Sequence, residues 1–174
     1  MRFSVRDTSR FAREVVFAAH RDEIERIAGE LPDVQRVEIR GRTRRADGWE
    51  EQTTLWVGSP SVLPLLLRPV VPPQMLQWRQ VTRWDPVAWV AQWTIDVPGL
   101  GPAIEAAGEN RYLAEGDGCT IAIDGDFAFR PDRVPALDAI PKAAVPVVEK
   151  AVVAMIVPMI ERTGAAVRQY LERR

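Results

Sequence analysis

Three pairs of alternating apolar and polar segments follow one another along the chain, and a short turn joins the members of each pair. The paired segments are residues 34–45 with 49–57, 75–84 with 87–97, and 103–115 with 119–130. The turns contain an Asp-Gly pair, an Asp-Pro pair and a Gly-Asp-Gly run, which are residues typical of hairpin turns. Because consecutive hairpins usually pair in chain order, the pattern predicts an antiparallel meander with one apolar face.

The last segment of the chain has helical periodicity. After a linker at residues 131–141, apolar side chains recur in a stripe of about six turns. The stripe consists of Val148, Val152, Met155, Ile156, Met159, Thr163, Val167 and Tyr170. Pro158 lies inside the segment and predicts a kink. Since only this helix is long enough to cover the sheet, we expect an α+β helix-grip fold: one domain, residues 1–174, with a curved antiparallel sheet wrapped around the C-terminal helix.

The N-terminal segment combines a predicted strand with a predicted short helix. Residues 11–19 (FAREVVFAA) are rich in apolar and β-branched side chains, which predicts a strand that could begin as early as Arg2. From Arg21 the apolar residues take helical spacing as far as Leu31, and Pro32 ends the helix.

The composition is that of a soluble globular domain. Of the 174 residues, 47% are hydrophobic and 27% are charged. The formal net charge of −1 gives no field that would attract nucleic acid, so we expect no nucleic-acid partner. The start of the chain lacks the apolar core of a signal peptide. The most apolar stretch, residues 62–71, is too short for a membrane-spanning helix, which needs about 20 residues. These features predict a cytoplasmic protein.

One cysteine and one histidine limit the chemistry that the chain can perform. Cys119 alone excludes an intramolecular disulfide and a cysteine zinc cluster, and His20 alone excludes a multi-histidine metal site. We expect His20 at a surface turn after the first strand, and Cys119 as a small buried hydrophobe. The sequence contains no Gly-rich phosphate loop and no metal-ligand spacing. It therefore predicts no cofactor, no metal and no catalytic residue set.

Four strings carry a resemblance to a known superfamily. They are VVFAAHRDEIERIAGELPDV (15–34), LPLLLRPVVPPQMLQW (63–78), YLAEGDGCTI (112–121) and CTIAIDGDFAF (119–129). Together with the element order, they make the chain resemble the START-like helix-grip superfamily, which includes polyketide cyclases, lipid-transfer proteins and the birch-pollen-allergen fold. The likeness covers about residues 11–170, and the strings at 63–78 and 112–121 resemble the lipid-transfer and uncharacterised bacterial branches. It implies a cavity between sheet and helix that holds a hydrophobic ligand. Members share no single catalytic motif, so it transfers no catalytic residue.

Tryptophans are concentrated in the middle hairpin. Four lie between Trp78 and Trp93. By strand parity, Trp89 and Trp93 share a face with Ala91 and Ile95, where indoles could line an apolar pocket or simply pack in the core.

Among polar residues that could face the cavity, Arg79 and Tyr112 are the main candidates, with Asn110 and Thr163 beside them. An inward Arg79 would anchor an acidic head group, whereas the alternative is an exposed strand arginine. The predicted cavity residues are Arg79, Trp89, Trp93, Tyr112, Ile121, Ile123, Phe127, Val152, Met155 and Met159.

Residues 59–73 combine five prolines with leucines and valines, so regular structure should be broken there. Large apolar side chains need a cover, because leaving one exposed costs about 1.5–3 kcal/mol. We predict a lid over the cavity formed by Leu63, Leu65, Leu66 and Leu67. A membrane contact, a dimer interface and a short buried helix are the alternatives.

An arginine stripe lies along the first hairpin. Its members on one strand face are Arg36, Arg40, Arg42 and Arg44, with Glu38 among them. Such a row could make transient contact with anionic head groups at a membrane surface. The alternative, which we favour, is the solvated face of the sheet.

These observations leave three functions open. The leading one is binding, and with it transport or sensing, of a small hydrophobic, lipid-like molecule in the cavity. The alternative is an enzyme of the polyketide cyclase or dehydratase kind, in which cavity shape does much of the work. The third is a protein-interaction module. No motif identifies the ligand or the oligomeric state.

Overall fold

The computed structural model describes residues 1–62, 76–98, 103–130, 133 and 145–174. In the C-terminal helix, the side chains of residues 145 and 147–156 lie outside this description. No helix in the described ranges is both long enough and apolar enough to cross a membrane.

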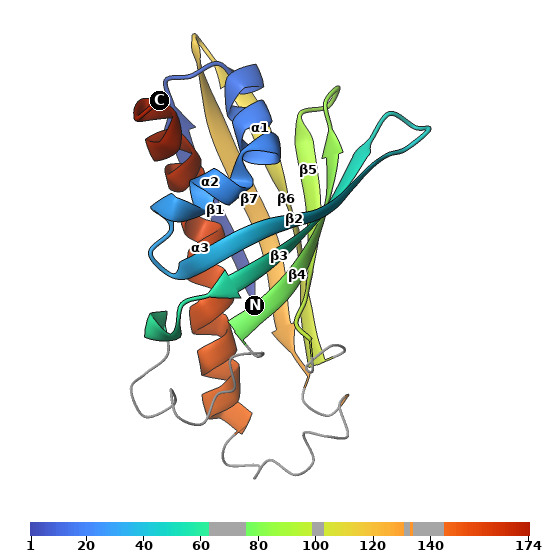
Figure 1. The fold of residues 1–174 in the computed structure, drawn as a ribbon, viewed down its shortest axis with the longest axis vertical. Helices are drawn as coiled ribbons and strands as arrows, with labels where there is room; N and C mark the ends of the chain where they lie inside the picture. The colour runs from blue at the N-terminus through green and yellow to red at the C-terminus, as the bar shows by residue number, and fades with distance from the viewer. Residues whose placement is uncertain (63–75, 99–102, 131–132, 134–144) are drawn as a thin grey trace.

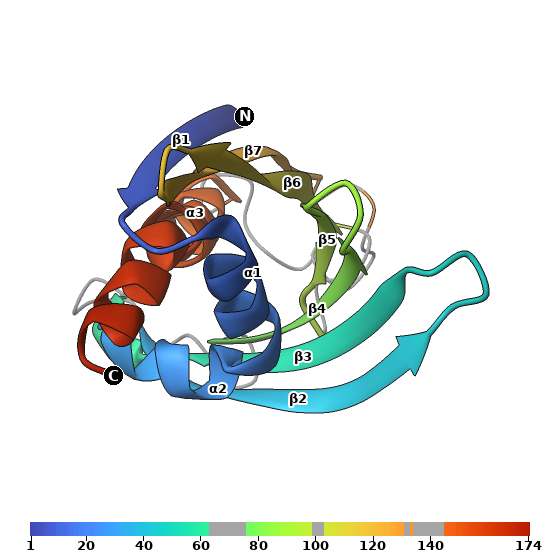
Figure 2. The same ribbon diagram turned by 90° about the horizontal axis from the view of Figure 1, so that it is seen from above.

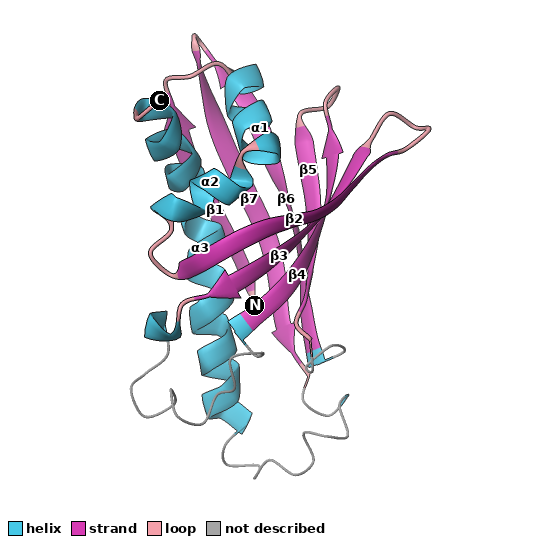
Figure 3. Cartoon of the chain, in the orientation of Figure 1, coloured by secondary structure: helices cyan, strands magenta, loops and turns pink. Residues whose placement is uncertain are grey.

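Seven strands form one antiparallel sheet (Figures 1 and 3). In chain order they are β1 (Arg2–Ser9), β2 (Val34–Arg44), β3 (Glu50–Gly58), β4 (Gln77–Asp85), β5 (Val90–Asp96), β6 (Ile104–Glu115) and β7 (Gly118–Phe129). Their order in the sheet is β1-β7-β6-β5-β4-β3-β2, so the three predicted hairpins are confirmed as a meander. Strand β1 adds to β7, which leaves β1 and β2 as the two edges.

Helices α1 (Arg13–Asp22) and α3 (Val145–Glu172) lie inside the curve of the sheet (Figure 2). The chain also contains α2 (Ile24–Ile27) and the short 3-10 helices η1 (Ala28–Glu30) and η2 (Pro60–Val62). Figure 2 shows α1 and α3 within the arc of the strands, whereas the turn between β2 and β3 projects away from it. Helix α3 contacts β1, β7, α1 and η1, so it packs against the sheet as the predicted cover.

The predicted strand over residues 11–19 is wrong, because this segment forms α1. Its buried residues Val16, Phe17, Ala19 and His20 occupy one side of a helix. Their burial against the sheet outweighs the strand preference of the β-branched pair at 15 and 16. The first strand is β1, which lies entirely upstream of that segment. The predicted short helix after Arg21 is confirmed as α2 followed by η1.

A pair of facing glycines makes room for large rings on the inner face of the sheet. Gly108 in β6 lies opposite Gly125 in β7. A Cβ atom on Gly108 would lie 2.3 Å from the Asp124 carbonyl oxygen and 2.4 Å from the Trp93 ring. The rings of Trp93 and Phe3 pack over the glycines with their centroids 6.3 Å apart. The glycines therefore fix where Trp93 lies.

Helix α3 is held along its C-terminal half by apolar packing and ion pairs. It continues through Pro158, and the predicted stripe residues Met159, Thr163 and Val167 are buried. At the surface, Arg168 pairs with Asp7 of β1 at 3.4 Å and Arg173 pairs with Glu30 of η1 at 2.8 Å.

Candidate functional site

A small cavity lies between the inner face of the sheet and the two main helices. Its walls consist of His20 (α1), Trp56 (β3), Gln80 (β4), Trp93 (β5), Asn110 (β6), Ile123 (β7), and Met159, Ile160 and Thr163 (α3). Its free volume is about 20 Å³, which is room for about one water molecule. Although it sits in the core, it mixes apolar and uncharged polar side chains.

Two hydrogen-bonded pairs of buried polar residues lie at one side of this cavity. The indole Nε1 of Trp93 donates a hydrogen bond to Asn110 Oδ1 at 3.0 Å. The hydroxyl of Tyr112 lies 2.5 Å from His20 Nδ1. Tyr112 is 1% exposed and His20 is 5% exposed. We call these four residues the polar chain: Trp93, Asn110, Tyr112 and His20. The polar chain is thus enclosed by protein.

Burial keeps this chain uncharged at neutral pH. It lowers the pKa of His20 to about 4, because desolvation disfavours the imidazolium ion. Burial also raises the pKa of Tyr112 far above its ordinary value, which outweighs the opposing effect of the Asn110 hydrogen bond. His20 is therefore a neutral imidazole, and Tyr112 keeps its phenolic proton.

Aromatic packing fixes the position of the His20 and Tyr112 rings. Phe17 packs edge-on against both Trp84 and Tyr112, with centroid distances of 5.3 and 5.0 Å. The His20 ring lies edge-on to Trp84 at 5.3 Å. Such contacts leave the imidazole few alternative orientations.

Several predicted cavity residues lie on the inner face. Trp93, Ile123 and Met159 line the cavity. Tyr112 belongs to the polar chain, and Asn110 and Thr163, which were singled out beside it, are wall residues. The further predicted residues buried on this side of the sheet are Ile121 and Phe127. Whether any of these residues contacts a ligand stays a prediction.

The placement predicted for Arg79 is wrong. It is exposed on the outer face of β4 and pairs with Asp96 at 3.2 Å. The inward residues of β4 have the opposite parity and include Trp78 and Gln80. A charged guanidinium on the inner face would lack a partner, so the strand places it toward solvent.

The placement of Trp89 by strand parity is also wrong. It precedes β5, in a turn, and has a φ of 59°. Its ring packs against Phe17 at 5.2 Å, and the Arg13 guanidinium lies 4.5 Å above it. It therefore closes the α1 end of the core and does not line the cavity.

Other predictions fall on residues outside the described part. They are the side chains of Val152 and Met155, and the proposed lid of Leu63, Leu65, Leu66 and Leu67. The interaction-module hypothesis depends on the same segment.

Sequence reasoning missed His20, which was expected at the surface. Its burial follows from the wrong strand assignment for residues 11–19. Read as a helix, the segment puts His20 one turn after Val16, on the inner side. Gln80 was also missed, because Arg79 was the residue of this strand considered for the cavity.

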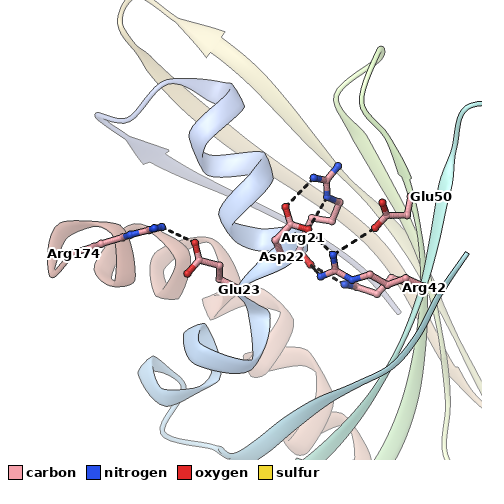
Figure 4. A network of polar contacts seen from close by, with 7 residues as sticks. Arg21, Asp22, Glu23, Arg42, Glu50 and Arg174 are labelled. Carbon is pink, nitrogen blue, oxygen red and sulfur yellow. Dashed lines mark hydrogen bonds and ion pairs between the residues drawn. The ribbon is translucent and has the colours of Figure 1, made fainter. Parts of the chain in front are cut away.

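The arginine stripe is balanced by acidic residues of the same chain. Arg36 pairs with Glu38 at 3.2 Å, and Arg40 pairs with the same carboxylate. Arg42 contacts Asp22 at 2.7 Å and lies 3.9 Å from Glu50 (Figure 4). These pairs support the interpretation of the stripe as a solvated face.

Comparison with known proteins identifies the fold. No protein-family model matches the sequence, and no curated protein sequence matches it. Among solved structures, the Zhui aromatase/cyclase from Streptomyces sp. R1128 is similar with a TM-score of 0.64 and 17% identity, over 100% of this chain and 94% of that one. A START superfamily protein from Mycobacterium smegmatis is similar with a TM-score of 0.57 and 14% identity, over 99% of this chain and 97% of that one. Norcoclaurine synthase from Thalictrum flavum is similar with a TM-score of 0.58 and 11% identity, over 100% of this chain and 87% of that one.

These similarities, with the curved seven-stranded sheet and its C-terminal helix, define a START-like helix-grip protein fold. At such low identities they establish the fold alone.

Proposed function

We propose that the protein binds a small, mainly apolar molecule in its interior, between the sheet and α3. The observation that carries this proposal is the set of uncharged polar residues around the cavity: His20, Asn110 and Thr163, with the half-buried Gln80. These groups are hydrogen-bonded, but paired polar groups add little stability compared with apolar side chains of the same shape, so stability alone does not account for them. Ligand pockets, by contrast, are mostly apolar with a few placed polar groups.

Two unpaired indole N–H groups support the proposal. Trp78 Nε1 and Trp84 Nε1 are both buried and have no hydrogen-bond partner among the residues that the structure describes. Leaving a buried donor unpaired costs about 1–3 kcal/mol. Trp78 stacks on the cavity residue Trp56 with a centroid distance of 5.8 Å, and Trp84 packs against His20. An oxygen atom of a bound molecule would offer such donors an acceptor.

The size of the cavity limits what it can hold. A free volume of about 20 Å³ accommodates one polar group and not a whole lipid. We therefore assign this cavity to the polar end of the ligand, with the apolar body extending along α3. The role that we propose for the protein is to carry or sense such a molecule.

Identifying co-purified molecules would test the proposal. The protein is purified from its native host and denatured in organic solvent, and the released molecules are compared by mass spectrometry with a mock purification. We expect one apolar compound at near-stoichiometric amount. Thr163→Leu, which fills the cavity, should lose it. Thr94→Leu, on the exposed outer side of β5, is the matched control and should keep it. Absence of any enriched compound, or equal retention by both variants, would contradict the proposal.

A second candidate function is an enzyme of the cyclase or dehydratase kind. The neutral His20 of the cavity wall, with Tyr112 buried behind it, favours this function, since a neutral imidazole can accept or relay a proton. Incubation of the co-purified compound and its precursors with protein would show turnover. His20→Gln should then abolish turnover while ligand binding persists, whereas a pure binder would convert nothing in either form.

A further inference from the structure

We infer that the cavity recognises an uncharged oxygen group of its ligand, a carbonyl or a hydroxyl, through the His20 Nε2–H donor, and that it discriminates against carboxylate and phosphate ligands. This inference rests on the proposed binding function and specifies its ligand class. It follows from the direction of the hydrogen bonds in the polar chain and from the charge of the cavity wall.

The direction of the hydrogen bond between Tyr112 and His20 follows from the buried hydroxyl. Its proton needs an acceptor, and among the described residues the one in hydrogen-bond contact with it is His20 Nδ1. In the neighbouring pair, the indole nitrogen of Trp93 can only donate, so the Asn110 atom that faces it is the carbonyl oxygen.

The acceptor for that proton is His20 Nδ1, at 2.5 Å from the hydroxyl oxygen. A neutral imidazole that accepts at Nδ1 carries its own proton on Nε2. His20 also lines the cavity. The hydrogen bond from Tyr112 thus leaves His20 with a proton on Nε2, which makes Nε2 a donor.

The opposite wall supplies an acceptor. The Thr163 hydroxyl donates to the Met159 carbonyl oxygen at 2.9 Å, which leaves its lone pairs for another donor. A ligand carbonyl would accept from His20, and a ligand hydroxyl could accept from His20 and donate to Thr163. Both groups are neutral.

Charge excludes an acidic ligand group from this part of the interior. None of the described residues around the cavity carries a charge, since His20 is neutral. Arg79, the strand arginine nearest in sequence to Gln80, is on the outer face with Asp96. A carboxylate in the cavity would lose its hydration without gaining a cation, which is strongly unfavourable.

The tautomer can be measured directly. His20 is the only histidine, so a nitrogen-15 NMR spectrum of the labelled protein contains a single imidazole. At neutral pH we expect a protonated Nε2 and an unprotonated Nδ1. A proton on Nδ1 would overturn the inference without any substitution that could impair folding.

Binding of matched probes tests the ligand class. Titration calorimetry compares acetylnaphthalene with naphthoate and with naphthalene, and decanol with decanoate. The aromatic and aliphatic series distinguish polyketide-like from lipid-like ligands. We expect each neutral oxygen compound to bind at least about tenfold more tightly than its carboxylate. His20→Phe should reduce the preference for acetylnaphthalene over naphthalene to near unity, and His20→Gln, which keeps an N–H donor, should restore part of it.

Arg79→Gln is the matched control, because it removes the cation on the outer face. It should change no affinity. The inference would be overturned if the carboxylates bound more tightly than the neutral compounds, or if Arg79→Gln lowered the affinity for the carboxylates. Either result would leave the binding function intact. If no probe of either series binds and no compound co-purifies, the proposed function fails together with it.

Discussion

His20 and Arg21 are neighbours on α1, yet they belong to opposite kinds of polar network. His20 ends the buried polar chain, in which no group is charged. Arg21 instead contacts Asp22 at 2.8 Å in an exposed network that includes Arg42 of β2 and Glu50 of β3 (Figure 4). In the exposed network, the hydrogen bond from Arg21 lowers the pKa of Asp22 and favours its charge. In the buried one, desolvation lowers the pKa of His20 and removes the charge.

The comparison shows that burial, and not residue type, decides how each network contributes. Most groups of the exposed pairs stay in contact with water and gain little from each contact. The buried chain has no water to replace a lost partner, so each of its bonds is costly to remove. Four measurements follow, in order of decreasing expected effect.

A glycine in each region provides the largest contrast. Gly108→Ala should destabilise the protein by more than about 3 kcal/mol, because the new Cβ would meet a backbone oxygen at 2.3 Å and the Trp93 ring at 2.4 Å. Gly41→Ala, on the arginine-rich hairpin, has no atom within 4 Å of its Cβ and should change stability by less than about 0.5 kcal/mol. Urea denaturation measures both. Equal effects would mean that Trp93 is not fixed by the glycine pair.

The buried histidine should make folding stability depend on pH. Burial lowers the pKa of His20 from 6.5 to about 4, so the unfolded chain binds more protons between these values. The stabilising contribution, on the order of 3 kcal/mol, is complete above pH 6.5 and is lost as the pH falls through about 4. The free energy of unfolding is compared with that of His20→Gln across this range, since carboxylates titrate equally in both. Parallel pH curves would contradict a buried, neutral His20.

The two tyrosines form a matched pair for hydroxyl removal. Tyr112→Phe should cost about 2 kcal/mol, because it leaves His20 Nδ1 buried without a donor. Tyr170→Phe removes a hydroxyl that bonds to Glu23 at the edge of α3, and should cost less than about 1 kcal/mol. Chemical denaturation again supplies the numbers. A larger loss for Tyr170 would reverse the contrast between the two networks.

The exposed network should show the smallest effect and the only strong dependence on salt. Arg42→Gln removes the contacts to Asp22 and Glu50, for an expected loss below about 1 kcal/mol that shrinks as salt screens the pairs. Thermal unfolding at low and high ionic strength tests this. A loss that is large and independent of salt would place Arg42 among the buried interactions.

The candidate site was only partly predictable. Strand parity identified Trp93, Ile123 and Tyr112, because β5 and β6 alternate between core and solvent and the apolar parity of β7 is buried from Cys119 to Phe127. Strand parity failed at Arg79. The pairing of β4 with β3 turns Trp78 and Gln80 inward and Arg79 outward, and this pairing between strands cannot be predicted from β4 alone. Sequence reasoning failed at His20, since nothing local distinguishes an apolar helix of ten residues from a strand with β-branched residues.

The sequence by itself determined the meander and its covering helix, because alternation, turn residues and helical periodicity are local properties that need no partner. Only the tertiary structure decided that His20 meets Tyr112, 92 positions away, and that both are shut off from water. The charge state of the interior depends on that enclosure. The sequence alone does not give the charge of a histidine, because the pKa of the side chain depends on whether the fold buries it away from water.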